Sequence, residues 1–226
     1  MSSNSNIILA SSSPRRRELL SLFEIPFEVR PAHIDETPRP NEPPKEYVQR
    51  LAREKAESLM TDYKLQNDVK SHWELVIAAD TTVTVDNEII GKPGDAAEAV
   101  EMLKKLRGRT HQVCTAITVS NLETGESIHE LCSSDVPMRN FSDEEMEAYV
   151  ASGDPLDKAG GYAIQHNGFH PVENFSHCYA SVMGLPLCHL TRALHKFKVE
   201  LSVDVPSKCQ QFNNYQCPVY REILAL

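Results

Sequence analysis

No segment of this sequence approaches the roughly 18 consecutive apolar residues that a membrane-spanning helix requires. The first residues, Met1 to Asn6, also lack the basic and apolar pattern of a signal peptide. None of the six cysteines forms a CxxC pair, and no paired spacing indicates a zinc site. We therefore expect free, mostly buried thiols in a cytoplasmic protein that has no membrane partner.

The sequence also lacks an excess of positive charge. It has 23 Lys and Arg residues against 32 Asp and Glu residues, which gives a formal net charge of -9 at pH 7. Because proteins that bind nucleic acids are usually basic, we expect no nucleic-acid partner. A small polyanionic ligand is compatible with this charge, because a local cluster of Arg and Lys can sit within an acidic surface.

Common catalytic signatures are missing as well. We find no GxxxxGK[ST], GxSxG, HExxH or strand-linked GxGxxG motif. What the sequence does have is the composition of a globular protein, with 41% hydrophobic and 24% charged residues among 226. That is enough apolar material for one domain, or for two lobes around one sheet.

Strand-like and helix-like patterns alternate along the chain. Strands are predicted over 6–10, 25–30, 73–86, 89–90, 111–121 and 126–138. Helices are predicted from Pro14 and over 45–60, 95–106, 143–151 and 185–197. This alternation favours an α/β fold with a mixed sheet, in one domain over 1–200. The polar residues 201–226 are typical of a mobile or loosely docked extension.

A cluster of hydroxyl and basic side chains lies where the first strand gives way to the first helix. Ser11 and Ser13 precede Pro14, and Arg15 and Arg16 follow it. The N-terminus of a helix has unpaired N–H groups and attracts phosphate, whereas cations there are unfavourable without an anion. The pattern indicates either a phosphate site or an exposed basic turn with a Ser-Pro phosphorylation site.

An acidic residue interrupts the most apolar strand. Asp80 follows Leu75 to Ala79 directly, and Thr81 follows it. A carboxylate in such a run must be paired, solvated in a cleft or bound to a metal, and ligand sites gather at strand ends. The alternative interpretation is an Asp that caps a turn.

Two lysines are candidates for phosphate contacts. Lys92 lies between Gly91 and Pro93, on a rigid loop that could present its charge to phosphate. Lys55 falls on the apolar face of the predicted helix 45–60. The alternatives are a solvated loop lysine at 92, and at 55 a packed stem with its amine extended to water.

A glycine-containing segment, 155–165, ends at Gln165. Its paired glycines allow a close backbone approach, and the amide of Gln165 offers a donor and an acceptor to the edge of a base. The alternative is a tight loop with a polar end.

Taken together, six segments resemble the Maf family of house-cleaning nucleotide pyrophosphatases. They occur in the family's order and rough spacing, and they are 8–16, 47–56, 79–81, 91–93, 157–165 and 184–186. The resemblance implies an elongated mixed sheet with flanking helices and two lobes around a central cleft, as in Maf and ITPase-like proteins. It also implies hydrolysis of a nucleoside triphosphate between the α- and β-phosphates with release of pyrophosphate, and a homodimer.

The resemblance implies a role for each candidate residue. Asp80 is the catalytic residue that accepts the proton of the attacking water, and with Glu36 it would hold a divalent cation, Mg²⁺ or Mn²⁺. The positions that line the phosphate site are Ser11, Arg16, Lys55 and Lys92. In the branch that acts on dTTP and UTP, three residues mark the base preference, and here they are Arg15, Thr81 and Gln165.

Some features depart from the family pattern. The segment 166–183 is divergent. At positions 181–186, where the family commonly has Asn-Val-Val-Gly-Leu-Pro, this chain has Ser-Val-Met-Gly-Leu-Pro. Two other functions stay open, namely a nucleotide-binding regulator of cell division and a pyrophosphatase for modified purine triphosphates. Asp80 and Glu36 favour the enzyme, and the base-preference residues favour a pyrimidine.

Overall fold

A computed structural model describes residues 6–66 and 73–225 of the chain. The signal-peptide expectation therefore concerns residues that, apart from Asn6, lie outside the described ones. Within the described ranges, none of the helices combines the length and the apolar character that a bilayer crossing needs. The six cysteines are free, and four of them are buried.

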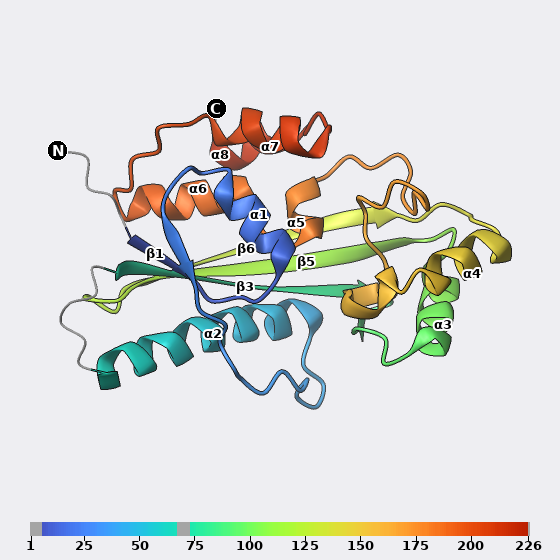
Figure 1. The fold of residues 1–226 in the computed structure, drawn as a ribbon, viewed down its shortest axis with the longest axis horizontal. Helices are drawn as coiled ribbons and strands as arrows, with labels where there is room; N and C mark the ends of the chain where they lie inside the picture. Colours follow the sequence, from blue (N-terminus) through green and yellow to red (C-terminus); the bar gives the residue numbers. More distant parts are fainter. Residues whose placement is uncertain (1–5, 67–72, 226) are drawn as a thin grey trace.

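A six-stranded mixed sheet forms the centre of the molecule (Figure 1). Its strands are β1 (Asn6–Leu9), β2 (Phe27–Val29), β3 (Trp73–Val85), β4 (Glu88–Ile90), β5 (Thr110–Asn121) and β6 (Ser127–Pro137). The order is β2-β1-β3-β5-β6, and β4 pairs with the far end of β3. β1 runs parallel to β2 and β3, whereas β4 and β5 run antiparallel to β3 and β6 antiparallel to β5.

One edge of β3 is interrupted, and this interruption decides where a site can form. β1 pairs with β3 as far as Ile77, and β4 takes over only at Val83. Between these two positions no strand of the described chain pairs with that edge, although β5 continues along the other one. The middle of β3, with Asp80 and Thr81, therefore borders a gap between two halves of the sheet.

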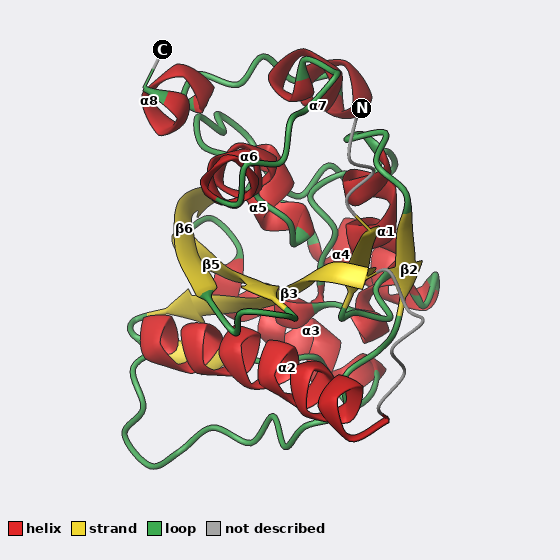
Figure 2. Ribbon diagram, turned by 90° about the vertical axis from the view of Figure 1, so that its left-hand side faces the viewer, coloured by secondary structure: helices red, strands yellow, loops and turns green. Residues whose placement is uncertain are grey.

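Helices cover both faces of the sheet (Figure 2). The long α2 (Pro44–Gln66) lies on one face, and α1 (Pro14–Ser21), α5 (Tyr179–Met183) and α6 (Leu187–Lys196) lie on the other. At the far end of β3 and β5 lie α3 (Ala96–Leu106), α4 (Asp143–Ala151) and the 3-10 turns η1 (Asp154–Asp157) and η2 (Ala159–Gly161). The predicted α/β fold with a mixed sheet and flanking helices is confirmed.

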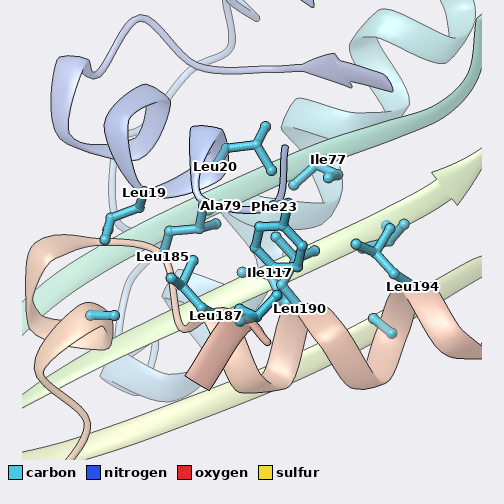
Figure 3. Close-up of a cluster of buried hydrophobic side chains, with 14 of the residues drawn as sticks. Leu19, Leu20, Phe23, Ile77, Ala79, Ile117, Leu185, Leu187, Leu190 and Leu194 are labelled. Atoms are coloured by element: carbon cyan, nitrogen blue, oxygen red, sulfur yellow. The ribbon is translucent and has the colours of Figure 1, made fainter. Parts of the chain in front are cut away.

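Two large apolar clusters lie on either side of the gap. In the first, Leu20 of α1 and Phe23, which follows that helix, pack with Leu190 of α6 against Ile77 and Ile117 (Figure 3). The second contains Val83 of β3, Val113 of β5, Leu103 of α3 and Tyr149 of α4, together with Phe141 from the loop before α4. The gap at the middle of β3 therefore lies between two packed apolar clusters.

Local signals explain where several helices begin. Ser13 caps α1 by accepting from the N–H of Arg16, and Pro14 takes the first helical position, where its missing N–H costs nothing. Asp95 caps α3 in the same way, and Ser142 forms a capping box with Glu145 at the start of α4. The predicted starts of these helices are confirmed to within one residue.

The segment after Leu201 contains two helices that the sequence pattern does not predict, α7 (Val205–Asn213) and α8 (Tyr220–Leu224). Val205 is buried in the first apolar cluster, and the Tyr215 hydroxyl donates to the carbonyl oxygens of Phe175 and His177. Arg192 of α6 donates to the carbonyl of Ile223 at 3.1 Å. The extension is therefore docked against the body.

Candidate active site

A cavity of about 520 Å³ opens at the interrupted edge of β3. Its lining includes all nine residues singled out from the sequence: Ser11, Arg15, Arg16, Glu36, Lys55, Asp80, Thr81, Lys92 and Gln165. They come from the loop after β1, the start of α1, the loop before α2, α2 itself, β3, the loop between β4 and α3, and the segment after η2. Residues that are as many as 154 positions apart in the sequence thus share one site.

The loop between β1 and α1 lines one side of the cavity. The Ser11 hydroxyl oxygen accepts from the backbone N–H of Ser13 at 3.2 Å and from Nη1 of Arg16 at 3.3 Å. Because this oxygen is occupied as an acceptor, the hydroxyl proton remains to donate toward the cavity. The wall can therefore offer an anion a hydroxyl donor beside the start of a helix.

Arg16 is fixed by three hydrogen bonds. Its Nε donates to the carbonyl of Gly184 at 2.9 Å, Nη1 donates to Ser11, and Nη2 donates to the Thr81 hydroxyl at 3.1 Å. A guanidinium has five N–H donors, so two remain, one on each terminal nitrogen. Two such donors match the two oxygens of a phosphate edge. Burial lowers the pKa of Arg16 and the charge of Asp80 opposes this shift.

Arg15 points to the opposite side of the cavity. Its Nη1 lies 3.7 Å from Oδ2 of Asp157, a largely exposed carboxylate in η1. The pair links the start of α1 with η1. Exposed pairs at this separation stabilise little, so Arg15 can leave Asp157 for a ligand at small cost.

Asp80, Lys55 and Glu36 form a charged triad at the centre of the site. Nζ of Lys55 donates to Oδ1 of Asp80 at 2.6 Å and lies 2.7 Å from Oε1 of Glu36. Burial raises the pKa of Asp80, and the charges of Lys55 and Arg16 oppose that shift. For the half-exposed Glu36, partial burial acts to raise the pKa, but the hydrogen bond and charge of Lys55 outweigh it and the pKa is lowered.

Tyr47 supports this triad although the sequence did not single it out. Its hydroxyl donates to the carbonyl of Glu36 at 2.9 Å. Burial and the neighbouring charge of Asp80 raise the pKa of Tyr47 to about 12, so it stays a neutral donor at neutral pH. Tyr47 precedes Lys55 by eight residues on α2, which is close to two helical turns. That spacing is the signal that could have placed both side chains on one face.

The acidic residues offer a limited set of metal ligands. Among residues 6–66 and 73–225, no group of three or more His, Cys, Asp or Glu side chains is arranged to hold a metal ion. Asp80 and Glu36, however, approach the same ammonium group, so their carboxylates lie close together. One or two carboxylates together with substrate phosphates and water are the usual ligands of Mg²⁺, so these two residues fit such an ion.

The opposite wall of the cavity is formed by two loops that contact each other. The N–H of Gly160 donates to the carbonyl of Gly91 at 2.9 Å, which ties the Lys92 loop to η2. Gly160 has φ of +73°, and a Cβ there would lie 3.1 Å from the side chain of Val83. Only glycine meets both requirements without strain. The segment that ends in Gln165 therefore lies against β3 because position 160 has no side chain.

Lys92 and Gln165 differ from the other site residues. Among the described residues, no side chain or backbone group forms a hydrogen bond with Nζ of Lys92 or with the Gln165 amide. Both line the cavity, and both are free to contact a ligand. The structure thus brings all nine predicted residues together, and among the described residues it gives the side chains of Lys92 and Gln165 neither a hydrogen bond nor an ion pair.

The chain is similar to known proteins over most of its length. The model of the family described as Maf-like protein matches residues 6–197. A dTTP/UTP pyrophosphatase of Geobacter sp. (strain M21) is 44% identical over 191 residues, which cover 84% of this chain and 95% of that protein. A dTTP/UTP pyrophosphatase of Bacillus mycoides (strain KBAB4) is 40% identical over 196 residues, or 87% of this chain and 97% of that protein.

A weaker likeness exists to a solved structure. The Staphylococcus aureus Ham1 protein aligns with 60% of this chain and 73% of its own chain, with 17% identity and a TM-score of 0.38.

Proposed function

This chain belongs to the Maf-like protein family, and from that premise we propose that it hydrolyses nucleoside triphosphates, dTTP and UTP among them, to the monophosphate and pyrophosphate. The observation that carries the proposal is the single cavity that contains all nine candidate residues. The relatives named dTTP/UTP pyrophosphatase, which are similar over most of the chain, support the same reaction.

The arrangement of charges suits a triphosphate. Phosphoryl chemistry depends on positioning and charge neutralisation more than on covalent groups of the protein. The two free N–H groups of Arg16, the proton of Ser11 and the ammonium of Lys92 can contact phosphate oxygens from both walls. Water would attack the α-phosphorus, and pyrophosphate would leave.

Asp80 is the residue that we assign as proton acceptor for the attacking water. Its burial raises its pKa, which makes the carboxylate a stronger base than an exposed aspartate. Lys55 holds the carboxylate in place through a 2.6 Å hydrogen bond. Asp80 thus has both the orientation and the basicity that proton abstraction needs.

Asp80 and Glu36 would also hold the divalent cation, Mg²⁺ or Mn²⁺, that the oxygen ligands favour. When bound, such an ion supplies positive charge to the phosphates and orients water. Lys55 sits between the same two carboxylates and keeps them paired without the ion. The two carboxylates could serve either metal, because both ions take oxygen ligands.

Base preference would come from the wall opposite Asp80. The free amide of Gln165 offers a donor and an acceptor, which match the N–H and carbonyl edge shared by uracil and thymine. Arg15 also lines the cavity, where it pairs with Asp157. Residues 1–200 would act as one domain of two lobes, in the cytoplasm and as a homodimer, without nucleic acid as a partner.

The test is pyrophosphate release from UTP, dTTP, CTP, GTP, ATP and 7-methyl-GTP, with Mg²⁺ or Mn²⁺ and with EDTA. We expect metal-dependent release that is greatest with UTP and dTTP. Release mainly from purine nucleotides would keep the reaction and reject the base assignment. Nucleotide binding without any release would reject the enzyme and support a regulator that senses nucleotides.

A further inference from the structure

A buried threonine that does not line the cavity is connected to Arg16. Thr115 lies on β5, directly opposite Thr81 in the register of β3 and β5, and it is fully buried. Its Oγ1 lies 2.9 Å from Oγ1 of Thr81 and 2.8 Å from the backbone carbonyl of Ser181. A Thr in a strand is ordinary, so the sequence gives no signal that singles it out.

The directions of these hydrogen bonds follow from the donors that are present. The carbonyl of Ser181 can only accept, so the single hydroxyl proton of Thr115 is donated to it. The Thr115 oxygen must then accept in its contact with Thr81, and the Thr81 proton is donated to Thr115. The Thr81 oxygen is left to accept from Nη2 of Arg16. Both hydroxyls in this series of hydrogen bonds from Arg16 to Ser181 can therefore donate in only one direction.

This order limits what Thr81 can do. Its proton is committed to Thr115 and one lone pair to Arg16, so the hydroxyl has no proton to donate to a base or a phosphate. Gly184 completes the arrangement, because a Cβ at that position would lie 3.2 Å from Nε of Arg16 and 3.4 Å from Oγ1 of Thr81. The carbonyl of Gly184 can accept from Nε of Arg16 at 2.9 Å only because position 184 has no side chain.

We propose that Thr115 is a positioning residue, which orients the Thr81 hydroxyl and through it the guanidinium of Arg16, so that two N–H groups of Arg16 face the phosphates. The inference rests on the proposed function for the identity of the ligand. Thr81 then influences the substrate through Arg16 and not by contact with the base.

The first test uses the protein without ligand. The Nε–H signal of Arg16 in a ¹⁵N-labelled sample is assigned by its loss in Arg16→Lys. In Thr115→Val we expect this signal to shift and its hydrogen exchange to accelerate about tenfold, because the Thr81 hydroxyl loses the acceptor that orients it and no longer holds the guanidinium in one position. Thr115→Ser should restore both. An Arg16 signal that is identical in Thr115→Val and wild type would overturn the proposal.

A matched control separates positioning from loss of a buried hydrogen bond. Thr118 lies on the same strand and is also buried, and it has a 3.0 Å contact with Nδ1 of the exposed His129. Among the described residues, no hydrogen bond joins Thr118 to Thr81 or Arg16. Thr118→Val should therefore lower the unfolding midpoint as Thr115→Val does, without any change at Arg16. An equal change of the Arg16 signal in both variants would show a general structural effect and reject the proposal.

The second test measures turnover of UTP in a double-mutant cycle. We expect Thr115→Val to lower kcat/KM about tenfold in the wild-type background, and Thr115→Ser and Thr118→Val to stay within about twofold of it. In the Arg16→Lys background Thr115→Val should cost less than about twofold, since the group that it positions is gone. Equal costs in both backgrounds would overturn the inference. If wild type hydrolyses no nucleotide, the proposed function fails, and the ligand-free signal of Arg16 still decides whether Thr115 positions it.

Discussion

The two walls of the cavity differ in how far their polar groups are satisfied within the protein. On the wall built by α1, α2 and β3, Arg16 donates to three partners and Lys55 bridges Asp80 and Glu36. On the opposite wall, Lys92 and Gln165 have no hydrogen-bond partner among the described residues. Groups that are held in place in advance act on chemistry, because no reorganisation is needed when charge develops. Groups without partners are available for recognition.

The largest effect is expected on the preorganised wall. Asp80→Asn keeps the shape of the side chain but removes the base, so we expect kcat to fall about 10³-fold with the fold retained. Steady-state kinetics with UTP and circular dichroism measure both. The control is Asp86→Asn, on the exposed turn at the end of β3, which should leave kcat unchanged. Turnover near the wild-type level in Asp80→Asn would remove Asp80 from its assigned role.

Lys55→Met should have the next largest effect. It removes the cation shared by Asp80 and Glu36 and leaves two neighbouring carboxylates without their partner. We expect kcat/KM to fall about 10²-fold, because Asp80 loses its fixed position. Lys45→Met, on the exposed start of the same helix, is the control and should retain activity. If both variants keep wild-type kinetics, the preorganisation of this wall has no catalytic value.

The stability of the folded protein should depend on pH through the buried pair of His111 and Tyr162. His111 contacts the Tyr162 hydroxyl at 2.7 Å, and burial lowers its pKa to about 4. The unfolded pKa is about 6.5, so between these values the unfolded chain binds a proton that the folded protein does not. This group therefore leaves stability unaffected above pH 6.5, and stability falls as the pH decreases toward 4.

We expect the free energy of unfolding to decrease by about 2 kcal/mol between pH 6.5 and pH 5 from His111 alone. Urea unfolding at both pH values, in wild type and in His111→Gln, measures this contribution as the difference in slope. His195→Gln, at the exposed end of α6, should keep the wild-type slope. The same slope in His111→Gln and wild type would contradict the assignment.

The smallest effect is expected on the unpaired wall. Gln165→Ala removes a group that has no structural partner, so stability should not change and hydrolysis should persist. We expect the ratio of kcat/KM for UTP over GTP to fall about tenfold, since one bidentate contact to the base is lost. Asn167→Ala, an exposed amide two residues later, is the control. An unchanged ratio would reject Gln165 as the residue that reads the base.

Structural features that depend on short stretches of sequence were predictable. The strand at 73–86, the hairpin formed by β5 and β6, and the starts of α1, α3 and α4 follow from alternation, turn residues and caps, and the structure confirms them. The five-residue α5 and the two helices of the extension were not predicted. A helix of one or two turns has too few apolar repeats to show a period, and its stability comes from packing.

The sequence by itself determined the chemistry of the site. It placed Ser11, Arg15 and Arg16 at a helix start and Asp80 in an apolar strand, because capping and side-chain periodicity are local properties of the chain. It could not determine which groups would face one another. The bridge of Lys55 between Asp80 and Glu36, the chain from Arg16 through Thr81 to Thr115, and the unpaired state of Gln165 all depend on the interrupted edge of β3. Only the tertiary structure decided them, because contacts between distant residues are fixed by strand register and by the packing of helices on the sheet.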